Sequence, residues 1–464
     1  MKSFYKHYSL FALILLTVTA TYSQTTVSSI ISSNQTWTAS GSPYLVNANA
    51  LVEAGVKITV EPGVVIKATV DRLKLIVDGT FEAIGKKDSV IFIDNLTIEF
   101  TEKSVGYNVS AGTGSQFQYV MFDGHSAGGT KTIDLKTKSM FVKNCKFVDG
   151  YYYIYSYTSG TKDTVDVIIE NSVFKGTQSY PQGYMVYASG NTRLSITDCY
   201  AENIGGITVG KWTTIKKSTF KNFGYSGGIR QTSGLNLVLE CNLFQNFRYT
   251  ILDLTYPGND ANIEVRENTF DSSEVLLKLR GGLLYKPKTL VIENNNFLRF
   301  KTNSVQVSVG PNPGKSDTLD LTSNYWGTST KADIELGIKD FTDDITIEGY
   351  VDFSGYLTAP IKTCTGGGTI GGADTSGINT GIAKIVDHAL TLYPNPADGM
   401  VQIEADGKII HNIKILDLQG KMHINEAVSA TNSSVDLSLL VEGIYVIEVS
   451  GDGFTSRNKL IVKH

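Results

Sequence analysis

Charged residues are scarce in this 464-residue sequence, and neither sign dominates. Lys and Arg together number 41 and Asp and Glu 45, which gives a net charge of −4 and a charged fraction of 19%. Ordinary soluble domains contain about 25% charged residues, and nucleic-acid binders concentrate positive charge on one surface. The composition therefore predicts no nucleic-acid partner.

Cysteine and histidine are also rare, with four and six residues in the chain. The sequence contains no CxxC motif, no HExxH motif and no cluster of these two residue types. Zinc sites depend on such closely spaced ligands. We therefore expect no metal site of this kind.

A long hydrophobic run is missing outside the N-terminal segment. Residues 1–23 begin with Lys2 and Lys6, continue with the apolar run Leu10–Val18 and end on small and polar residues, with Ser23 as the expected cleavage point. This order is typical of a signal peptide for export across the inner membrane. A membrane-spanning helix needs roughly 20 apolar residues, about twice this run, so we expect no transmembrane segment in the mature protein.

Glycine and tyrosine, in contrast, are abundant, with 45 and 24 residues. Between the glycines lie many short runs of Val, Ile, Leu, Thr and Phe. This composition favours closely spaced strands and tight turns. A mostly helical protein is therefore excluded.

An eight-residue pattern that ends on an aromatic residue recurs through the middle of the chain. Its aromatic positions are Phe147, Phe174, Tyr200, Phe220, Phe244, Phe270, Phe297 and Trp326, at intervals of 20 to 29 residues, and Phe122 extends the series backward. The repeat at Tyr200 fits with a one-residue slip. Apolar residues stand five and seven positions before most of these aromatic residues, a period of two that indicates one buried face. Strand repeats of this length indicate a solenoid, in which each turn pairs with the next.

A small residue stands two positions before each aromatic residue. These residues are Cys145, Ser172, Asp198, Ser218, Asn242, Asn268, Asn295 and Asn324. We predict a tight turn inside the coil, where stacked amides bond one another and the turn backbone and where Asn tolerates the left-handed conformation.

Two further features of the repeats are a column of charged residues and the spacing of three cysteines. Four positions before the aromatic residue, Lys216, Glu240, Arg266 and Glu293 alternate in sign, which we interpret as a structural ladder between turns about 4.8 Å apart. The cysteines Cys145, Cys199 and Cys241 are spaced two turns apart. Disulfide Cα atoms are about 4.4–6.8 Å apart, so we predict no disulfide among these three.

The repeats resemble the right-handed parallel β-helix family over about residues 30–360. The stretches Leu51–Ala68 and Leu73–Gly85 are similar to the first turns of secreted bacterial β-helices, and Ser323–Gly327 is similar to a closing turn. The resemblance implies an all-β protein with a right-handed parallel β-helix, the pectin lyase-like solenoid, at residues 24–361. We expect residues 331–360 to cover its last open edge.

A Gly-rich stretch at residues 362–385 predicts a flexible linker before a second domain at residues 386–464. In this domain short strands alternate with turn residues every 8 to 12 positions or so, as in a small Ig-like antiparallel β-sandwich. Two prolines are expected to begin its first strand, and Gly420 and Gly443 to supply turn conformations that other residues resist.

The motifs of this second domain resemble the C-terminal sorting domain (type A) of cargo for the Bacteroidetes type IX secretion system. The residues that carry the resemblance are Tyr393, Pro394, Asn395, Pro396, Gly420, Gly443, Tyr445, Lys459 and Lys463. The resemblance implies recognition by the type IX secretion machinery and passage through the outer membrane. The protein is then secreted or attached to the outer cell surface.

The second strand of each turn carries aromatic and charged residues on its predicted outer side. The residues that we assign to carbohydrate binding are Tyr155, Tyr187, Arg230, Asp253 and Lys278, with Thr208 and Gln306 in the same column and Arg280 beside it. Sugar rings stack on aromatic side chains while their hydroxyls bond to charged groups. We therefore favour a glycan-interacting or structural surface protein, and we expect a monomer.

The alternative is a polysaccharide lyase or glycoside hydrolase acting in a groove on this face. Arg230, Lys278 and Arg280 could supply the base of a lyase and the cation that binds the uronate carboxylate of its substrate. Asp253 could hold calcium as a cofactor. Hydrolysis needs two carboxylates about 5–9.5 Å apart, and Asp253 has no obvious partner. The alternating signs of Arg230, Asp253 and Lys278 also fit a structural ladder without chemistry.

Overall fold

The computed structural model describes residues 24–124, 129–158, 163–176, 183–224, 228–231, 236–255, 260–280, 287–299, 307–309, 318–343, 349–362, 391–405, 408–417, 422–451 and 454–463. The predicted signal peptide and all of the predicted linker except Lys362 lie outside these residues. Among them, the helical segments are η1 (Ala39–Gly41) and α1 (Lys331–Glu335). A search of the same residues finds no helix long and apolar enough to cross a membrane.

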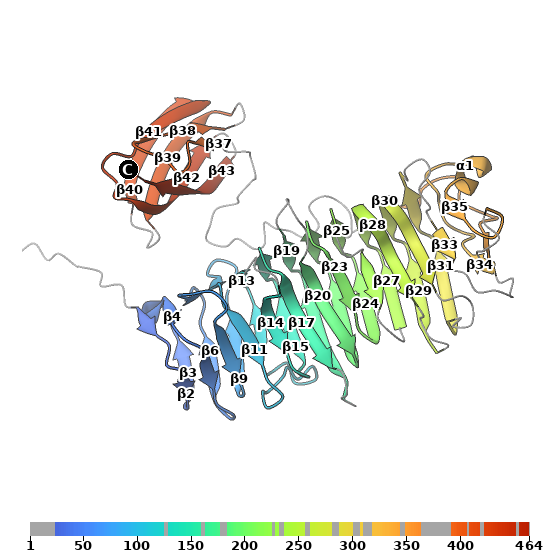
Figure 1. Cartoon of the computed structure of the whole chain (residues 1–464), viewed down its shortest axis with the longest axis horizontal. Coiled ribbons are helices and arrows are strands. Elements are labelled where there is room, and N and C mark those ends of the chain that lie inside the picture. The colour runs from blue at the N-terminus through green and yellow to red at the C-terminus, as the bar shows by residue number, and fades with distance from the viewer. Residues whose placement is uncertain are drawn as a thin grey trace, which may run out of the picture.

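The N-terminal part is a parallel β-solenoid over residues 30–298. One coil shows the plan: β15 (Met140–Lys143), β16 (Lys146–Val148) and β17 (Tyr152–Thr158) lie on three successive faces, and β18 (Val165–Glu170) returns to pair in parallel with β15. Figure 1 shows the coils stacked along the long axis of the solenoid, from blue at the N-terminus to yellow. The repeats of the sequence are therefore the coils of the fold.

Face 1 is an 11-stranded parallel sheet. Besides β15 and β18, its strands are β3 (Gln35–Trp37), β6 (Lys57–Val60), β9 (Thr80–Ile84), β12 (Gln116–Gln118), β21 (Thr192–Thr197), β24 (Trp212–Lys216), β27 (Asn236–Glu240), β29 (Asn262–Arg266) and β31 (Thr289–Glu293).

Faces 2 and 3 belong to one 23-stranded sheet, because two long strands, β28 (Leu243–Thr255) and β30 (Thr269–Arg280), run across both. The other strands of face 2 are β1 (Thr25–Thr26), β4 (Tyr44–Val46), β7 (Val65–Ala68), β10 (Ile91–Asp94), β13 (Val120–Asp123), β16, β19 (Val173–Lys175), β22 (Tyr200–Glu202), β25 (Thr219–Lys221) and β32 (Asn296–Leu298). Those of face 3 are β2 (Ile30–Ile31), β5 (Ala50–Val52), β8 (Lys74–Val77), β11 (Thr97–Phe100), β14 (Lys131–Leu135), β17, β20 (Tyr184–Gly190), β23 (Gly206–Val209), β26 (Ile229–Gln231), β33 (Val307–Val309) and β35 (Ile338–Lys339).

The aromatic column forms the centre of the core on face 2. Phe147 is stacked between Phe122 and Phe174, with ring centroids 4.5 and 4.6 Å away, and all three rings are fully buried. Tyr200 does not join the column: the slip places Ala201 opposite Phe174 and leaves Tyr200 half-buried. Because Ala201 is apolar, the column contains no polar side chain at this coil.

The polar column is an internal hydrogen-bonded ladder, as predicted. The backbone amide of Cys145 donates to the hydroxyl of Ser172. In a second run, each backbone amide donates to the side-chain oxygen of the next member, in the order Cys199, Ser218, Asn242, Asn268, Asn295 and Asn324. Two expectations were wrong. Because of the same slip, Cys199 rather than Asp198 is the bonded member at its coil. In the other repeats the left-handed conformation falls one residue before the predicted position, whereas Asp198 is left-handed as predicted. The left-handed residues are Asn144, Asn171, Asp198, Lys217, Cys241, Glu267, Asn294 and Ser323.

The charge ladder on face 1 is confirmed. Lys216 Nζ lies 2.6 Å from Glu240 Oε2, and Arg266 is ion-paired with Glu293. Exposed pairs of this kind stabilise the register weakly.

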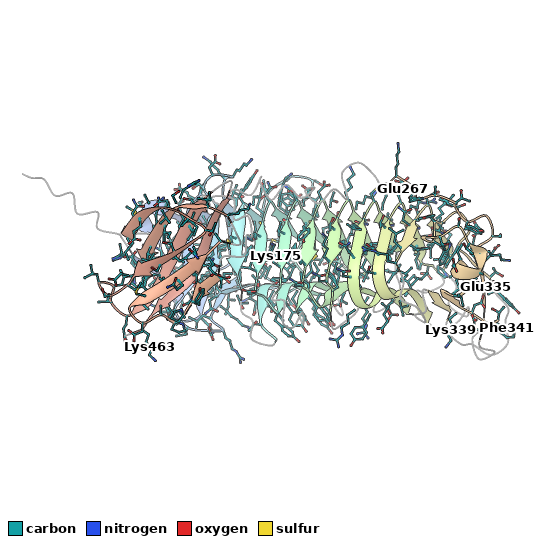
Figure 2. The ribbon with its side chains drawn as sticks, turned by 90° about the horizontal axis from the view of Figure 1, so that it is seen from above. Lys175, Glu267, Glu335, Lys339, Phe341 and Lys463 are labelled. Atoms are coloured by element: carbon teal, nitrogen blue, oxygen red, sulfur yellow. The ribbon has the colours of Figure 1, made fainter. Side chains whose placement is uncertain are left out.

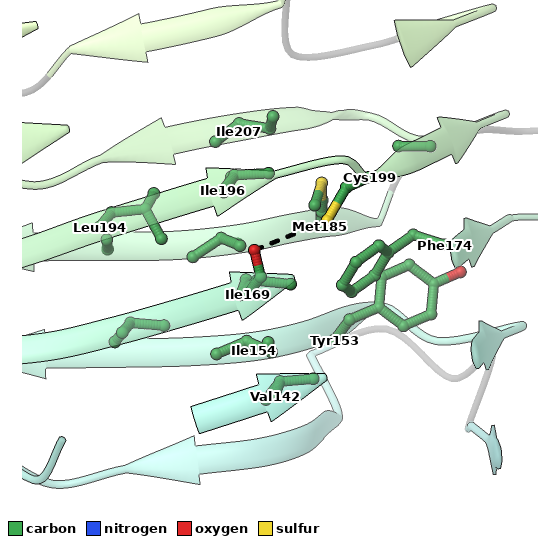
Figure 3. Packing of buried hydrophobic residues seen from close by; sticks show 14 of the residues in the cluster. Val142, Tyr153, Ile154, Ile169, Phe174, Met185, Leu194, Ile196, Cys199 and Ile207 are labelled. Atoms are coloured by element: carbon green, nitrogen blue, oxygen red, sulfur yellow. Dashed lines mark hydrogen bonds between the residues drawn. The ribbon is translucent and has the colours of Figure 1, made fainter. Parts of the chain in front are cut away.

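Cys145 and Cys199 are free and buried, as predicted. Figure 3 shows Cys199 among aliphatic side chains, with its sulfur 3.7 Å from the carbonyl oxygen of Ile169. Burial raises the pKa of both thiols to about 12, so neither is reactive. Cys241 is disulfide-bonded, which the comparison of the three repeat cysteines did not predict.

The C-terminal end of the solenoid is covered by residues from the predicted capping segment. β34 (Thr318–Asp320) pairs with β36 (Tyr350–Asp352), and β35 pairs with β33. The side chains of Ile334, Ile338 and Val351 join the core of the solenoid. Figure 2 shows Glu335, Lys339 and Phe341 together at this end.

The C-terminal domain has two antiparallel sheets around a core of its own, as predicted. One contains β37 (Thr391–Tyr393), β38 (Met400–Glu404) and β41 (Asn432–Asp436). The other contains β39 (Ile410–Asp417), β40 (Met422–Ala430), β42 (Gly443–Gly451) and β43 (Phe454–Val462).

Candidate functional site

Face 3 aligns the five predicted carbohydrate-binding residues in one column of its strand register. In register, coil by coil, the column contains Asp134, Tyr155, Tyr187, Thr208, Arg230, Asp253 and Lys278. Ser308 lies opposite Lys278 at the next strand. Gln306, predicted for that place, lies outside the described residues, and the backbone of β30 places Arg280 opposite Thr255.

Five outward tyrosines form a cluster on β17 and β20, which we call the tyrosine platform: Tyr152, Tyr155, Tyr157, Tyr184 and Tyr187. The two strands pair in register, so equivalent tyrosines meet. The rings of Tyr155 and Tyr187 are stacked with centroids 4.9 Å apart and planes 9° apart, and those of Tyr152 and Tyr184 are stacked at 5.4 Å and 14°. Edge-to-face contacts join the two stacks.

A sixth tyrosine of these strands points inward. Tyr153 is buried against Phe174, and its hydroxyl donates to the carbonyl of Lys175 over 2.7 Å. The hydroxyls of the platform tyrosines make no hydrogen bond within the described part of the chain.

Partial burial raises the pKa of two platform tyrosines, Tyr152 and Tyr155. Desolvation, reinforced by the neighbouring tyrosines, raises the pKa of Tyr152 to about 12 and also raises the pKa of Tyr155. A neutral phenol can both donate and accept a hydrogen bond. Tyr152 and Tyr155 therefore present uncharged hydroxyls at physiological pH.

Sequence reasoning missed the polar group at the edge of this platform. β14, one coil before β17, contributes Lys131 and Asp134, and Lys136 follows its last residue; Asp134 lies opposite Tyr155. Lys131 Nζ lies 3.8 Å from the centroid of the Tyr155 ring and 2.9 Å from Asp134 Oδ2, while Lys136 Nζ lies 3.1 Å from the same oxygen. The stretch KTIDLKTK at residues 131–138 was the available signal, since it falls one repeat before the tyrosines.

The Asp134 carboxylate raises the pKa of its neighbour Lys136. Burial acts to lower the pKa of Lys136, but the carboxylate of Asp134 outweighs it, and the pKa of Lys136 is raised. Lys136 therefore stays protonated beside Asp134.

The stacking restricts how a sugar can bind to the platform. One face of the Tyr155 ring is covered by Tyr187 and the other by Lys131. The second face of Tyr187 points along the coil axis toward the coil of Thr208. A sugar ring can therefore stack on Tyr187, whereas it reaches the face of Tyr155 only when Lys131 moves.

The residues proposed for catalysis lie further along the same column. Arg230 is exposed and lies opposite Asp253, which lies opposite Lys278. This order of charges fits a ladder as well as a lyase site. No group of three or more His, Cys, Asp or Glu side chains able to hold a metal occurs in the described ranges. Calcium at Asp253 therefore stays a hypothesis.

In the C-terminal domain, hydrogen bonds that involve two of the sorting residues join residues 395–397 to residues 461–463. Asn395 Oδ1 accepts a hydrogen bond from the Ile461 amide at 2.9 Å, and the Lys463 amide donates to the Ala397 carbonyl at 2.9 Å. Tyr393 is exposed, and its hydroxyl donates to Glu404 Oε1. The buried Tyr445 donates to the carbonyl of Val441 over 2.8 Å. Lys459 belongs to β43, and Gly420 lies outside the described residues.

Two local expectations for this domain were wrong. Pro394 and Pro396 follow β37 and precede β38, so they end a strand instead of beginning one. Gly443 does not have a left-handed backbone, and an added Cβ would meet only ordinary contacts. Gly399 is the residue with a positive φ, of 76°, that favours glycine here.

Residues 391–463 match the family described as the secretion system C-terminal sorting domain. All nine residues that carry the sorting motif lie within this match. No curated protein matches the chain.

Proposed function

We propose that this cargo of the type IX secretion system, exported to the cell surface or the extracellular space, binds polysaccharide on the tyrosine platform without cleaving it. The observation that carries the proposal is the platform itself, in which stacked outward rings with unbonded hydroxyls lie on a rigid sheet. A rigid array loses little conformational entropy when a chain of sugars is bound.

The residues around the platform support the same function. Lys131, Lys136 and Asp134 lie at one edge, and Thr208 and Arg230 continue the column at the other. Coils are about 4.8 Å apart, close to the length of one sugar unit, so an extended polysaccharide could contact successive coils. We also expect the protein to act as a monomer, because one chain contains the whole platform.

Binding is favoured over catalysis by the pairing of charges. In the alternative function, a polysaccharide lyase, Arg230, Lys278 or Arg280 would need to act on a sugar. Arg230 and Lys278 each lie opposite Asp253 in the register of face 3, so a carboxylate is adjacent to both positions. A lyase base works best when its proton affinity is tuned by an electropositive site, and an adjacent carboxylate opposes that.

Affinity electrophoresis of the secreted protein in gels that contain neutral or uronate polysaccharides tests the proposal. We expect retardation of the wild-type protein and its loss in the variant with both Tyr155→Ala and Tyr187→Ala. Tyr107→Ala is the matched control, because the Tyr107 ring is also partly exposed and stacked, on Phe141 of face 1, at 5.0 Å. It should leave retardation unchanged.

Absorbance from new double bonds and the release of reducing ends are followed with the same polysaccharides. Either signal would favour the lyase or hydrolase alternative. Equal retardation of wild type and the double variant would show that binding occurs elsewhere, and no retardation in any gel would contradict the proposed function.

A further inference from the structure

Asp134, at the edge of the tyrosine platform, has one oxygen without a partner. Its side chain is 3% exposed, and no group in the described part of the chain bonds to Oδ1. Buried polar atoms are nearly always hydrogen-bonded in native proteins, and an unpaired carboxylate oxygen is among the most costly exceptions. A donor is therefore expected at Oδ1 in the functional state of the protein.

Both neighbouring cations bind the other oxygen of the same carboxylate. Lys131 and Lys136 lie 2.9 and 3.1 Å from Asp134 Oδ2. The Lys131 ammonium also lies over the Tyr155 ring, so one group contacts the aromatic face and the carboxylate together. The Lys131 side chain is 23% exposed, which allows it to turn toward solvent while Lys136 keeps Asp134 paired.

We infer that Asp134, Tyr155 and the place now taken by Lys131 form a saccharide subsite of the platform. A sugar ring stacks on the face of Tyr155 in place of the Lys131 ammonium, and one of its hydroxyls donates to Asp134 Oδ1. The inference rests on the proposed glycan binding and adds the residues that select the sugar.

The chemistry of the unpaired atom selects a neutral glycan. An ionised carboxylate oxygen only accepts hydrogen bonds, so its partner must be a donor such as a sugar hydroxyl. A uronate carboxylate or a sulfate cannot itself donate to Oδ1, and Asp134 would repel such a charge on the sugar unit that occupies the subsite. Lys136 does not offset this repulsion, since it stays bound to Asp134 when Lys131 turns away.

Two substitutions in the secreted full-length protein test the subsite, with laminarin, xyloglucan and dextran as neutral probes and polygalacturonate as the anionic probe. Lys131→Met keeps the aliphatic stem but removes the ammonium that competes for Tyr155. We expect it to strengthen binding of a neutral probe about threefold. Asp134→Asn removes the charged acceptor, and we expect it to weaken the same binding about tenfold.

Matched controls come from ion pairs on face 1. Lys57→Met breaks the pair with Glu82, and Asp166→Asn breaks the pair with Arg193. Both should leave the dissociation constant of the neutral probe unchanged. Thermal melting of each variant checks that the solenoid is folded.

Weaker or unchanged neutral-probe binding by Lys131→Met, or unchanged binding by Asp134→Asn, would overturn the subsite. Binding of polygalacturonate alone would also overturn it, while the platform would remain a glycan site. If none of the four probes binds to the wild-type protein, the subsite and the proposed function both fail.

Discussion

Asn268 and Asn295 lie one coil apart inside the solenoid, and the side-chain nitrogen of Asn268 donates to Oδ1 of Asn295 over 3.1 Å. Both side chains are fully buried. The same Oδ1 also accepts the backbone amide of Asn268, at 3.0 Å. One side-chain oxygen thus satisfies two donors of the preceding coil, and the bond repeats along the column.

Substitution of this ladder should destabilise the solenoid. Asn268→Leu leaves the backbone amide and the side-chain nitrogen of Asn242 without their acceptor, since both bond to Asn268 Oδ1. We expect the free energy of unfolding to fall by about 1–3 kcal/mol. Denaturant unfolding followed by circular dichroism measures the change, provided that the free energy of unfolding depends on denaturant concentration with the same slope in both proteins.

Asn262→Leu is the control for that experiment. Asn262 also bonds to an Asn of the preceding coil, Asn236, but it is only partly buried. Its substitution should cost less than that of Asn268. Equal small effects at the two positions would mean that the internal ladder contributes little.

The C-terminal domain should be required for release but not for folding. Its hydrophobic core is separate from that of the solenoid. We expect a chain that ends at Gly381 to fold and to accumulate in the periplasm, because the sorting domain has been removed. Immunoblots of periplasm and culture medium, with the full-length chain as control, measure the distribution. Release of the truncated chain at the full-length level would contradict this prediction.

Asp123 should make stability depend on pH. Burial, together with repulsion from Asp94 and Asp149, raises its pKa to about 6, whereas an unfolded Asp titrates near 4. Between these values the folded chain binds more protons than the unfolded chain, so this group's contribution to stability falls as the pH rises from about 4 to 6. Asp123→Asn removes the cost of the charged form, and we expect the variant to exceed wild type in stability at pH 7.5.

The difference between the two proteins at pH 7.5 should shrink at pH 4.5, where Asp123 is protonated in the folded wild type. Thermal midpoints of both proteins at the two pH values measure it, and the comparison cancels the titration of other groups. A variant that is less stable than wild type at pH 7.5 would show that Asp123 is stabilised as a carboxylate.

The sequence was informative about the coils because of how a parallel solenoid is built. Each repeat lies directly on the next, so aligned positions such as Phe147 and Phe174 become neighbours in space. The same logic correctly paired Lys216 with Glu240 and aligned Tyr155 with Tyr187. The period of two within each strand then separated buried from outward residues.

The sequence by itself determined the two-domain all-β architecture, the order of the coils and the sorting motif, because these depend on repeated local patterns. Tertiary structure decided how the slip near Cys199 is absorbed, which turn residue becomes left-handed, and that Lys131 and Asp134 meet Tyr155. Lys131 and Tyr155 are separated by one full coil, whose corners set the register of β14 on β17. Their contact also depends on side-chain rotamers, which no column of an alignment records.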